Sequence, residues 1–388
     1  MKFSCSTFDL LHALQLVSRA IGSQQALPIL GNVLVEAEGR RCTVSATDLE
    51  LSIITQFDAS IENEGSITIP AKAILNFAQY NSDAEVLLET LEGTQLRCTS
   101  KHAKTMIAGE AASEYPTIAS VERQTSLVLE AEPLLEALHL VTFASAKSSL
   151  RPVLSGVLFQ RIGASLTLVT TDSYRLSEYT LKTKEKGEEI SCIIPTKILD
   201  ELRSIIGSSL KKVSPQDGGG KEEPKGAIKV PEISLFLSKQ QIEVHAGNVR
   251  LLSRLIDGKF PDYRQILPKD GKTNALFAAH EFSTAVKRMH YFAKEMNNNL
   301  TFHVAKGQVK MSTPQTQIGR DEAVLAAEVA GDENKIALSS SYLLDFLGHI
   351  HTDNVLMKVT DSLHPAVFTL PENPRYLHLI MPLRMQEE

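Results

Sequence analysis

The chain has 388 residues, of which 43% are hydrophobic and 22% are charged, and its formal net charge is −6. This length exceeds what one hydrophobic core usually supports, so we expect two or three domains of an ordinary soluble protein. The negative charge argues against a surface coated by nucleic acid, although it is compatible with a local basic lining. No basic segment followed by an apolar stretch opens the sequence, and no run reaches the roughly 18 apolar residues of a membrane span. These features predict a cytoplasmic protein.

The first predicted elements are a helix, a hairpin, a second helix and another hairpin. The opening helix is amphipathic, and its apolar face carries Leu10, Leu14, Val17 and Ile21. The first hairpin turns at Gly39, the second helix covers about residues 72–80, and the second hairpin covers residues 86–98. Helices and strands in this mixed order predict an α+β fold.

The same pattern returns further along the chain with a nearly constant spacing. The equivalent positions are Pro28 and Pro152, Gly39 and Gly163, Thr47 and Thr171, each 124 residues apart, and Pro70 and Pro195, 125 residues apart. A third copy is fainter, with a hairpin pattern over residues 299–313 and a strand-then-helix pattern over residues 335–350. We therefore predict three similar domains, because a repeat of this length is a duplicated domain and too long for a solenoid unit.

The spacing between the second and third copies is longer by about 20 residues. Gly307 and Ser339 lie 144 residues beyond Gly163 and Pro195. A segment rich in Gly, Pro, Lys and Glu, residues 214–232, accounts for the surplus and is predicted to be an inserted loop. The predicted domains are residues 1–124, 125–264 (with this insertion) and 265–388.

The sequence contains four cysteines. Cys5, Cys42, Cys98 and Cys192 lie far apart, so we expect buried thiols in a reducing compartment rather than disulfides or a metal site. We expect no cofactor.

Three short motifs are the candidate enzyme sites. Residues 218–221 resemble a phosphate-binding loop, but Glu222 follows where that loop needs Ser or Thr. His349 and His351 do not share a helical face, and residues 171–173 lack the glycines of a nucleophile elbow. The repeated Thr-Asp is more typical of a turn closed by side-chain hydrogen bonds. An acyl or phosphoryl hydrolase is kept as the alternative from another functional class.

Several segments, taken together, resemble a known family. They are Leu27–Leu30, Thr170–Ser177, Ser253–Tyr263 and Met381–Met385. In this order, on a triplicated chain, they are similar to the bacterial β sliding clamp family, the β subunit of DNA polymerase III, and the resemblance covers nearly the whole chain. It implies the DNA clamp fold with three similar domains per chain and a head-to-tail homodimer that closes into a six-domain ring. Helices would line the hole and sheets would lie outside.

The resemblance also implies a function without catalysis. Such a ring encircles duplex DNA without reading its sequence and tethers the replicative polymerase, the clamp loader and other replication and repair proteins, which confers processivity. A clamp-like paralogue without a replication role is the closer alternative, because this chain departs from the family at Gln24, Gln265 and Asn297.

Basic residues on the inner helices are expected to contact DNA phosphates weakly, since a clamp must slide. The candidates are Lys147, Arg151, Lys197, Arg203, Lys211 and Lys212. The alternative for each is a solvated surface cation, and Arg151 is favoured because it coincides with a basic position of the family. Gln24 replaces another basic residue, which puts one DNA contact in doubt.

In the family, partner proteins insert a short hydrophobic peptide into a cleft between the second and third domains. By position, this pocket carries over to Leu154, Thr171, Ser173, Tyr174, Arg175, Leu176, Pro261, Ile266, Tyr342, Leu363, Pro365, Leu379, Ile380, Met381, Pro382, Leu383 and Arg384. Ordinary core packing is the alternative for Leu154, Leu176 and Ile380. Gln265, Asn297 and Pro365 depart from the family's residues, so the pocket rim is expected to prefer a somewhat different peptide.

The resemblance also places a dimer interface. Tyr291 and Phe292 fall where the family buries apolar residues between subunits, although packing within their own domain is the alternative. The charged residues expected to face each other across the interface are Lys101 and Lys104 on one side and Asp321 and Glu322 on the other. Apolar burial should dominate and charge should set the register.

Overall fold

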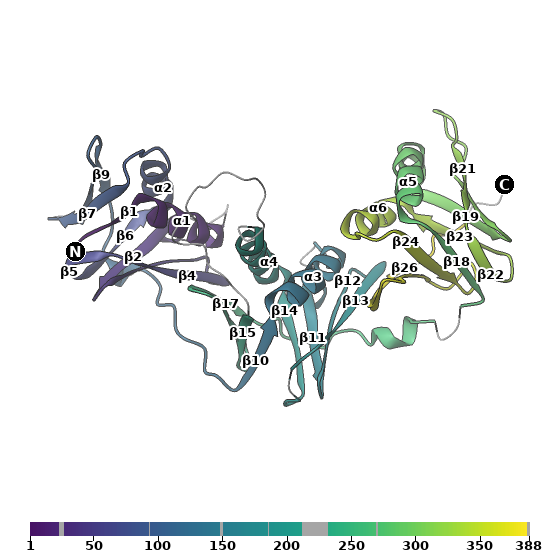
Figure 1. Cartoon of the computed structure of the whole chain (residues 1–388), viewed down its shortest axis with the longest axis horizontal. Coiled ribbons are helices and arrows are strands. Elements are labelled where there is room, and N and C mark those ends of the chain that lie inside the picture. Colours follow the sequence, from purple (N-terminus) through teal and green to yellow (C-terminus); the bar gives the residue numbers. More distant parts are fainter. Residues whose placement is uncertain are drawn as a thin grey trace, which may run out of the picture. The chain divides into compact units, whose positions relative to one another are not determined.

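The computed structural model describes residues 1–22, 27–92, 94–147, 150–184, 186–211, 232–268 and 271–385, with the backbone alone for residues 209–211 (Figure 1). The chain forms two compact units. One contains Met1–Glu132 with Lys197–Leu255, and the other contains Pro133–Thr196 with Ile256–Glu388.

A similar order of elements occurs three times along the chain, although among the described residues the second copy has four strands between its two helices where the first and third copies have five. The first copy contains β1 (Lys2–Ser6), α1 (Thr7–Val17), β2 (Asn32–Glu38), β3 (Arg41–Thr47), β4 (Leu51–Asp58), β5 (Ser60–Asn63), β6 (Gly65–Pro70), α2 (Ala71–Gln79), β7 (Glu85–Leu91), β8 (Gln95–Thr99) and β9 (Lys104–Ala108). The second contains β10 (Thr125–Glu130), α3 (Ala131–Val141), β11 (Gly156–Ile162), β12 (Ser165–Thr171), β13 (Arg175–Lys182), β14 (Ile190–Pro195), α4 (Thr196–Lys211), β15 (Glu232–Leu237), β16 (Gln241–Ala246) and β17 (Val249–Arg254). The third contains β18 (Thr273–Ala278), α5 (Ala279–Ala293), β19 (Asn299–Ala305), β20 (Gln308–Ser312), β21 (Glu322–Ala326), β22 (Glu328–Gly331), β23 (Asn334–Ser339), α6 (Ser340–His349), β24 (Asn354–Val359), β25 (Ala366–Leu370) and β26 (Asn373–Ile380). The predicted triplicated α+β fold is confirmed.

Each unit contains two antiparallel sheets. In the first unit the strand orders are β5-β1-β7-β8-β9 and β10-β15-β16-β17-β4-β3-β2-β6. In the second unit they are β14-β11-β12-β13-β26-β25-β24-β18-β22 and β21-β20-β19-β23. The two large sheets each join strands of successive copies, because β17 pairs with β4 and β26 pairs with β13.

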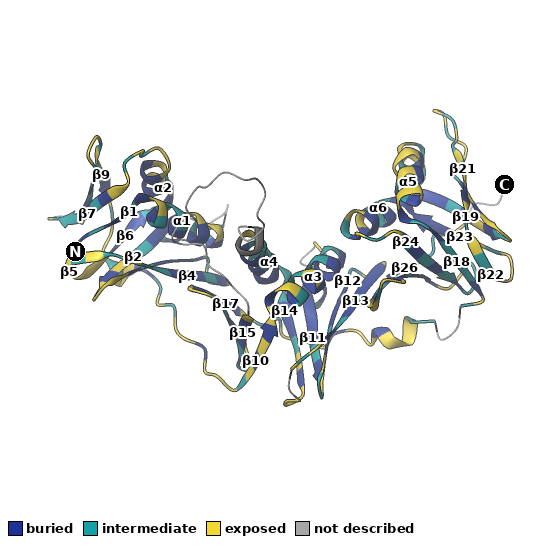
Figure 2. Ribbon diagram, viewed as in Figure 1, coloured by how far each residue is buried: buried dark blue, intermediate teal, exposed yellow. Residues whose placement is uncertain are grey.

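The helices cover the sheets with their apolar faces. In the first unit α1 packs on α2 and β4, and in the second α5 packs on α6. Figure 2 shows buried residues concentrated on the sheets and on one side of these helices. On α1 the predicted face is confirmed for Leu10, Leu14 and Val17, which are completely buried.

Helix α1 begins at a side-chain cap and ends in a short 3-10 turn. The hydroxyl of Ser6 accepts a hydrogen bond from the amide of Asp9 at 3.4 Å, which is an N-cap. The helix ends at Val17 and a 3-10 turn, η1 (Ser18–Ala20), follows it. Ile21 therefore lies beyond the helix, and its predicted place on the apolar face was wrong.

Glycines mark the equivalent hairpin turns, as the repeat predicted. Gly39, Gly163 and Gly307 have φ angles of +61°, +61° and +80°. Residues with a Cβ rarely adopt this backbone conformation. A Cβ on any of the three would meet no atom within 4 Å, so conformation rather than space requires glycine there.

The cysteines are all free thiols. Cys5, Cys42 and Cys98 are buried, as expected, and Cys192 is half-buried. Burial raises the pKa of Cys5, Cys98 and Cys192 to about 12, which makes these thiols poor nucleophiles. The predicted insertion lies outside the described residues except for Glu232, where β15 begins.

Candidate functional site

The repeated Thr-Asp segment forms a tight turn between β12 and β13. The Thr171 hydroxyl accepts from the amide of Ser173 and donates to the carbonyl of Arg175, at 3.1 and 2.7 Å. One Asp172 carboxylate oxygen accepts from the amides of Tyr174 and Arg175, at 2.9 and 3.0 Å. These bonds hold Ser173 at a φ of +80° and leave Tyr174 61% exposed. The expectation of a turn closed by side-chain hydrogen bonds is confirmed.

Arg175 is the most enclosed cation at this turn, with 5% of its surface exposed. Its Nε donates to Asp172 at 3.0 Å and its NH1 to Asp345 of α6 at 2.6 Å. Its NH2 donates to the carbonyl of Phe143 at 3.1 Å, and the guanidinium carbon lies 4.8 Å from the ring centre of Tyr342. All three guanidinium nitrogens therefore have partners, and a buried charge is compensated.

Two tyrosines stand above this network. Tyr174 and Tyr342 have ring centres 6.4 Å apart, with planes 20° from parallel. Burial raises the pKa of Tyr342, and the charge of Asp172 adds to it. The phenol of Tyr342 therefore stays neutral and can serve as a hydrogen-bond donor beside an apolar surface.

The C-terminal segment lies beside this turn, where β13 and β26 pair. We call this junction of the second and third copies the seam. Arg175 and Leu176 of β13 pair with Ile380 and Leu379 of β26. Beyond the strand, the amide of Met381 donates to the carbonyl of Tyr174 at 2.8 Å, and the amide of Leu383 donates to Ala337 at 2.7 Å. The backbone of the tail is thus fixed, while the side chains of 381–383 remain half-buried.

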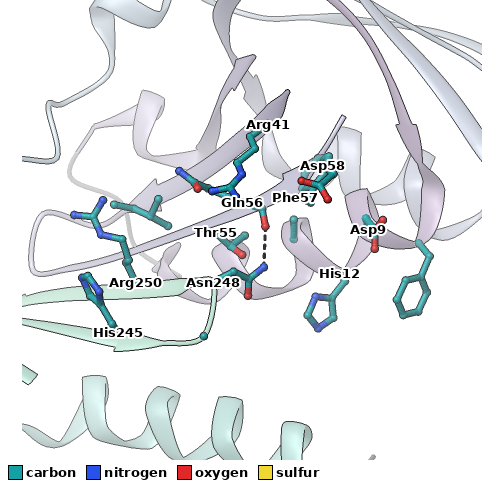
Figure 3. A pocket seen from close by; sticks show the side chains of 14 residues that line it. Asp9, His12, Arg41, Thr55, Gln56, Phe57, Asp58, His245, Asn248 and Arg250 are labelled. Carbon is teal, nitrogen blue, oxygen red and sulfur yellow. Dashed lines mark hydrogen bonds between the residues drawn. The ribbon is translucent and has the colours of Figure 1, made fainter. Parts of the chain in front are cut away.

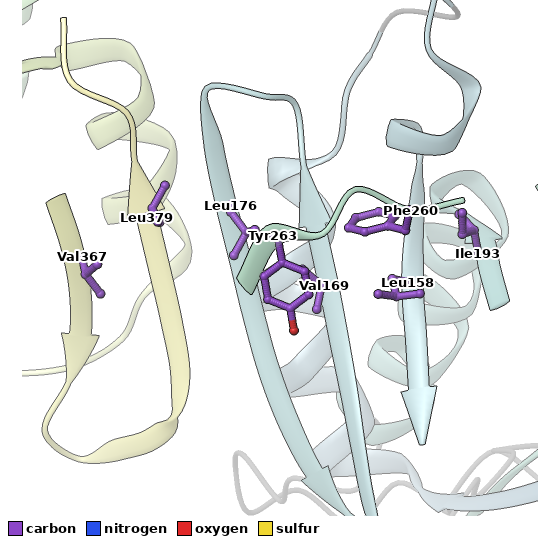
Figure 4. Close-up of a cluster of buried hydrophobic side chains, with 8 residues drawn as sticks. All are labelled: Leu158, Val169, Leu176, Ile193, Phe260, Tyr263, Val367 and Leu379. Carbon is purple, nitrogen blue, oxygen red and sulfur yellow. The ribbon is translucent and has the colours of Figure 1, made fainter. Parts of the chain in front are cut away.

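An apolar cluster forms the floor next to this seam (Figure 4). Its buried members are Leu158, Val169, Leu176, Ile193, Phe260, Tyr263, Val367 and Leu379, and Val153, Ile256, Leu267, Leu377 and Met381 pack against it. Figure 4 shows Phe260 and Tyr263 on an irregular segment that crosses the strands of the sheet. Side chains from three distant parts of the chain therefore meet here, as a binding site at a domain junction requires.

The structure brings most of the predicted pocket residues to this region. Leu154, Thr171, Arg175, Leu176, Pro365, Leu379 and Ile380 are buried; Tyr342, Met381, Pro382 and Leu383 are half-buried; Ser173, Tyr174, Pro261, Ile266, Leu363 and Arg384 are exposed. The burial of Leu154, Leu176 and Ile380 fits the core alternative, so they form a floor at most. Leu363, at 82% exposure, lies on the loop before β25, and no described contact joins it to the cluster.

Sequence reasoning missed several residues of this region. Phe260 and Tyr263 lay inside a recognised motif without an assigned role, and Val367 lies on β25. Asp345 follows Tyr342 by three residues on α6, a spacing that places both on one helical face and offered a signal. No local sequence pattern pointed to Phe143, because it contacts this region through the hydrogen bond that its carbonyl accepts from Arg175, 32 residues away.

The first unit carries a polar hollow of about 840 Å³ where α1, the β3 and β4 strands and the β16–β17 turn meet (Figure 3). Asp9, His12, Arg41, Asp58, Asn248 and Arg250 are among its lining residues. The side chain of Asn248 donates to the carbonyl of Gln56 at 2.7 Å. Charges of both signs line it, so it shows no preference for an anion or a cation.

The predicted DNA contacts differ in what they touch. Lys147 is exposed, and Arg151 donates to the hydroxyl of Ser173 at 3.3 Å. Lys197 pairs with Asp48, and Arg203 lies 3.4 Å from Asp200. The side chain of Lys211, and the whole of Lys212 and Gln24, lie outside the described residues.

The Lys197–Asp48 pair belongs to the first-copy turn that corresponds to Thr171–Arg175. Burial alone would raise the pKa of Asp48, but hydrogen bonds from Lys197 and from the amides of Leu51 and Glu50 outweigh it and lower that pKa. Asp48 thus stays ionised and ties its turn to α4.

Two of the charged residues predicted at a dimer interface lie on edge strands. Lys104 begins β9 and Glu322 begins β21, and each strand is the outermost of its sheet among the described strands. Within the chain Asp321 pairs with Arg288 at 2.8 Å and Glu322 with Lys310 at 3.0 Å.

Two aromatic residues lie on α5 of the same unit as β21. Tyr291 is 67% exposed and Phe292 is half-buried. Their rings meet edge to face, with centres 5.4 Å apart. The exposure of Tyr291 does not fit the alternative of packing within its own domain.

Comparison with known protein families decides the identity. Profiles of the N-terminal, central and C-terminal domains of the DNA polymerase III beta subunit match residues 1–119, 128–218 and 264–384. Together they cover well over half of the chain. The chain belongs to the DNA polymerase III beta subunit family.

Individual beta subunits match over their whole length. The chain is 28% identical to the "Beta sliding clamp" of Haemophilus influenzae and 27% identical to that of Synechocystis sp., with 99% of this chain and 100% of each relative covered. The sliding clamp structure from Bacillus subtilis is 25% identical, with all of both chains covered and a TM-score of 0.89. The beta subunit structure from Thermotoga maritima, at 23% identity and a TM-score of 0.88, supports the fold. Among the described residues, no helix is long and apolar enough to cross a membrane.

Two of the positions expected to depart from the family make local interactions within their own turns. Asn297 ends the 3-10 turn η7 (Lys294–Met296) with a φ of +54°, and Asn298 follows at +60°. Asparagine tolerates this left-handed conformation better than an aromatic residue does. Gln265 donates to Asp262 at 2.8 Å, within its own turn, rather than toward the apolar cluster.

Proposed function

We infer that this chain is a DNA sliding clamp, a non-catalytic subunit that keeps a DNA polymerase on its template. The observation that carries this conclusion is the match of all three family domains, in order, on a chain with three copies of one α+β module. Full-length relatives are named beta sliding clamps and not enzymes. We place the domains at residues 1–124, 125–264 and 265–388 and the protein in the cytoplasm, with its template.

We propose that two chains join head to tail into a closed six-domain ring, with helices lining the hole and sheets outside. Two strands that are outermost in their sheets among the described strands support this arrangement. Strands β9 and β21 have the same alternation of exposed and buried residues, with Met106 and Val324 exposed at equivalent places. β9 and its preceding turn carry Lys101 and Lys104, whereas β21 carries Glu322, so edge-to-edge pairing would satisfy both backbone and charge.

The ring would hold DNA by topology, and the contacts with phosphates would be few. Of the predicted cations, Lys147 and Arg151 are exposed, while Lys197 pairs with Asp48 within the chain. Closure makes strong contacts unnecessary, and it fits a chain whose net charge is −6.

Partner proteins, including the polymerase III catalytic subunit and the clamp loader, would bind by a short apolar peptide at the β13–β26 seam. The proposal is supported by exposed Tyr174, whose carbonyl binds the amide of Met381 beside the buried apolar cluster, and by the half-buried side chains of Met381 and Leu383. Burial of two or three large side chains would supply most of the affinity, and the neighbouring polar groups would fix direction.

The topological claim is tested on a nicked circular plasmid to which labelled protein is loaded by a clamp loader with ATP. The protein should co-elute with the circular DNA and should be lost when a restriction enzyme linearises it. Equal retention on both forms would mean ordinary DNA binding. A protein that stays monomeric and is never retained would instead favour a clamp-like paralogue without a replication role.

A further inference from the structure

Aromatic and histidine side chains pack behind Arg175. Phe143 lies on η4 (Thr142–Ala144), directly after α3. Its ring stacks on His349 at the end of α6, with centres 4.2 Å apart and planes 13° from parallel. It also lies 5.4 Å from the ring of His378, which is completely buried on β26. Phe143 thus contacts α6 and β26 of the third copy.

Phe143 also touches Arg175 in two ways. Its carbonyl accepts from NH2 of Arg175 at 3.1 Å, and its ring centre lies 5.6 Å from the guanidinium carbon. The remaining partners of the guanidinium are Asp172, Asp345 and the face of Tyr342. Because the guanidinium lies close to both rings, loss of the Phe143 ring would remove one of the contacts that set its orientation relative to Tyr342.

The first copy has different residues at the positions equivalent to Phe143 and Arg175. At the spacing of 124 residues, Arg19 corresponds to Phe143 and Leu51 corresponds to Arg175. Arg19 itself reaches α4, with Nε 3.1 Å from Glu201 and NH1 2.7 Å from the hydroxyl of Ser204. In the second copy the cation comes from β13, next to the exposed Tyr174, and an aromatic ring occupies the position from which Arg19 reaches out. The second copy therefore has a residue that contacts Arg175 at the position where the first copy has a cation with polar partners of its own.

We propose that Phe143 is a positioning residue of the peptide site: it orients Arg175 and, through that guanidinium, the Tyr342 ring that faces Tyr174. The inference rests on the proposed function, namely that this seam binds an apolar partner peptide. Phe143 need not touch the peptide to act this way.

The test measures the affinity of a short fluorescein-labelled peptide from the polymerase III catalytic subunit of the same cell, by anisotropy, with the full-length protein. Phe143→Leu keeps the carbonyl and an apolar side chain but removes the ring face, and should raise Kd about tenfold, the effect of one misplaced hydrogen-bonding group. Phe143→Tyr keeps the ring and should bind as the parent does. Phe346→Leu is the matched control, since Phe346 stacks on His378 but has no described contact with Arg175. It should lower the melting temperature without changing Kd.

A double-mutant comparison separates positioning from general loosening of the seam. In an Arg175→Lys background, Phe143→Leu should add no further loss of affinity, because the group through which it acts has changed. If Phe143→Leu binds like the parent, or if its effect on Kd persists undiminished in the Arg175→Lys background, the positioning role is overturned while the peptide site stands. If the parent protein itself fails to bind the peptide, the proposed function of the seam fails first, and the inference with it.

Discussion

Two ion pairs of this chain occupy equivalent turns but differ in burial, and their contributions to stability should differ accordingly. Lys197 is half-exposed beside Asp48, whereas Arg175 is buried between Asp172 and Asp345. Removing one partner of a buried pair leaves an uncompensated charge, while an exposed pair contributes little.

We predict that Arg175→Met lowers the free energy of unfolding by about 2 kcal/mol or more, and that Lys197→Met lowers it by less than about 1 kcal/mol. Urea denaturation of the two variants, followed by circular dichroism, makes the comparison. Equal losses in both would show that burial of the guanidinium does not set its contribution.

Buried His378 should make the stability depend on pH. Burial lowers the pKa of its imidazole far below the usual range, and the nearby charge of Arg175 adds to this effect. Its Nδ1 lies 2.8 Å from the hydroxyl of Ser177, and its Nε2 has no partner among the described residues. The ring is therefore neutral in the folded state, whereas in the unfolded chain it titrates near pH 6.5.

Below about pH 6.5 the unfolded state binds one proton more than the folded state at this position, so His378 contributes stability above that pH and the contribution is lost as pH falls, by about 1.4 kcal/mol per pH unit. His378→Asn, which can still bond to Ser177, should flatten the decline of the unfolding free energy between pH 6.5 and 5. The exposed His303→Asn serves as control and should leave the slope unchanged. A His378→Asn slope equal to that of the parent would contradict a neutral buried imidazole.

At the scale of elements, two glycines with left-handed φ face different constraints. Gly307 turns the β19–β20 hairpin at φ +80° with open space around it, whereas Gly331 ends β22 at φ +99° against the carbonyl of Lys272. A Cβ on Gly331 would lie 1.9 Å from that oxygen, so the backbone of β18 or β22 would have to move.

We predict that Gly307→Ala lowers the free energy of unfolding by about 1 kcal/mol, which is the conformational strain alone. Gly331→Ala should cost about 3 kcal/mol, because overpacking against backbone adds to the strain. Thermal unfolding of both variants provides the measurement. Similar shifts in melting temperature would mean that β22 can move aside without loss.

The edges of β9 and β21 make a second prediction at this scale. Lys104→Glu should weaken the dimer by about three- to tenfold through repulsion from Glu322, and adding Glu322→Lys should restore it. Sedimentation equilibrium gives the dimer dissociation constants. Lys306→Glu, on the β19–β20 turn, is the control for the change in net charge. Failure of the double variant to recover would remove Lys104 and Glu322 from the interface.

The elements show what the sequence could and could not provide. Local patterns located the hairpins around Gly39, Gly163 and Gly307, since turn glycines and alternating residues act over a few positions. They did not reveal that β4 pairs with β17 or β13 with β26, because a strand's partner across 200 residues is chosen by tertiary packing. The pocket list came from family resemblance for the same reason, and Phe143 and Asp345, which both contact Arg175, escaped it.

For the whole molecule, the internal repeat explains how one chain can supply both equivalent and specialised junctions. The Thr-Asp turns of the first two copies share their hydrogen bonds, and Leu49 and Ser173 share a left-handed φ of +76° and +80°. At the first turn Asp48 binds Lys197, which ties it to α4. At the second turn Arg175 forms an ion pair with Asp172, and Tyr174 is exposed. The same backbone turn thus carries an ion pair to a helix in the first copy and an exposed tyrosine in the second.

A ring that holds DNA by enclosure should respond to salt differently from a protein that holds it by charge. In a plot of log affinity against log salt, each phosphate bound by a cation adds about −0.9 to the slope of direct binding, whereas a closed ring is released only by opening or by reaching a DNA end. We therefore predict that protein loaded on circular DNA survives a wash at a salt concentration that abolishes its binding to linear duplex. Arg151→Ala should reduce the salt slope for linear DNA by about one unit, the share of a single phosphate, and leave retention on circles unchanged. Nitrocellulose filter binding gives the slope and gel filtration gives the retention. If Arg151→Ala instead empties the circles at the same salt, charge rather than enclosure would be holding the DNA.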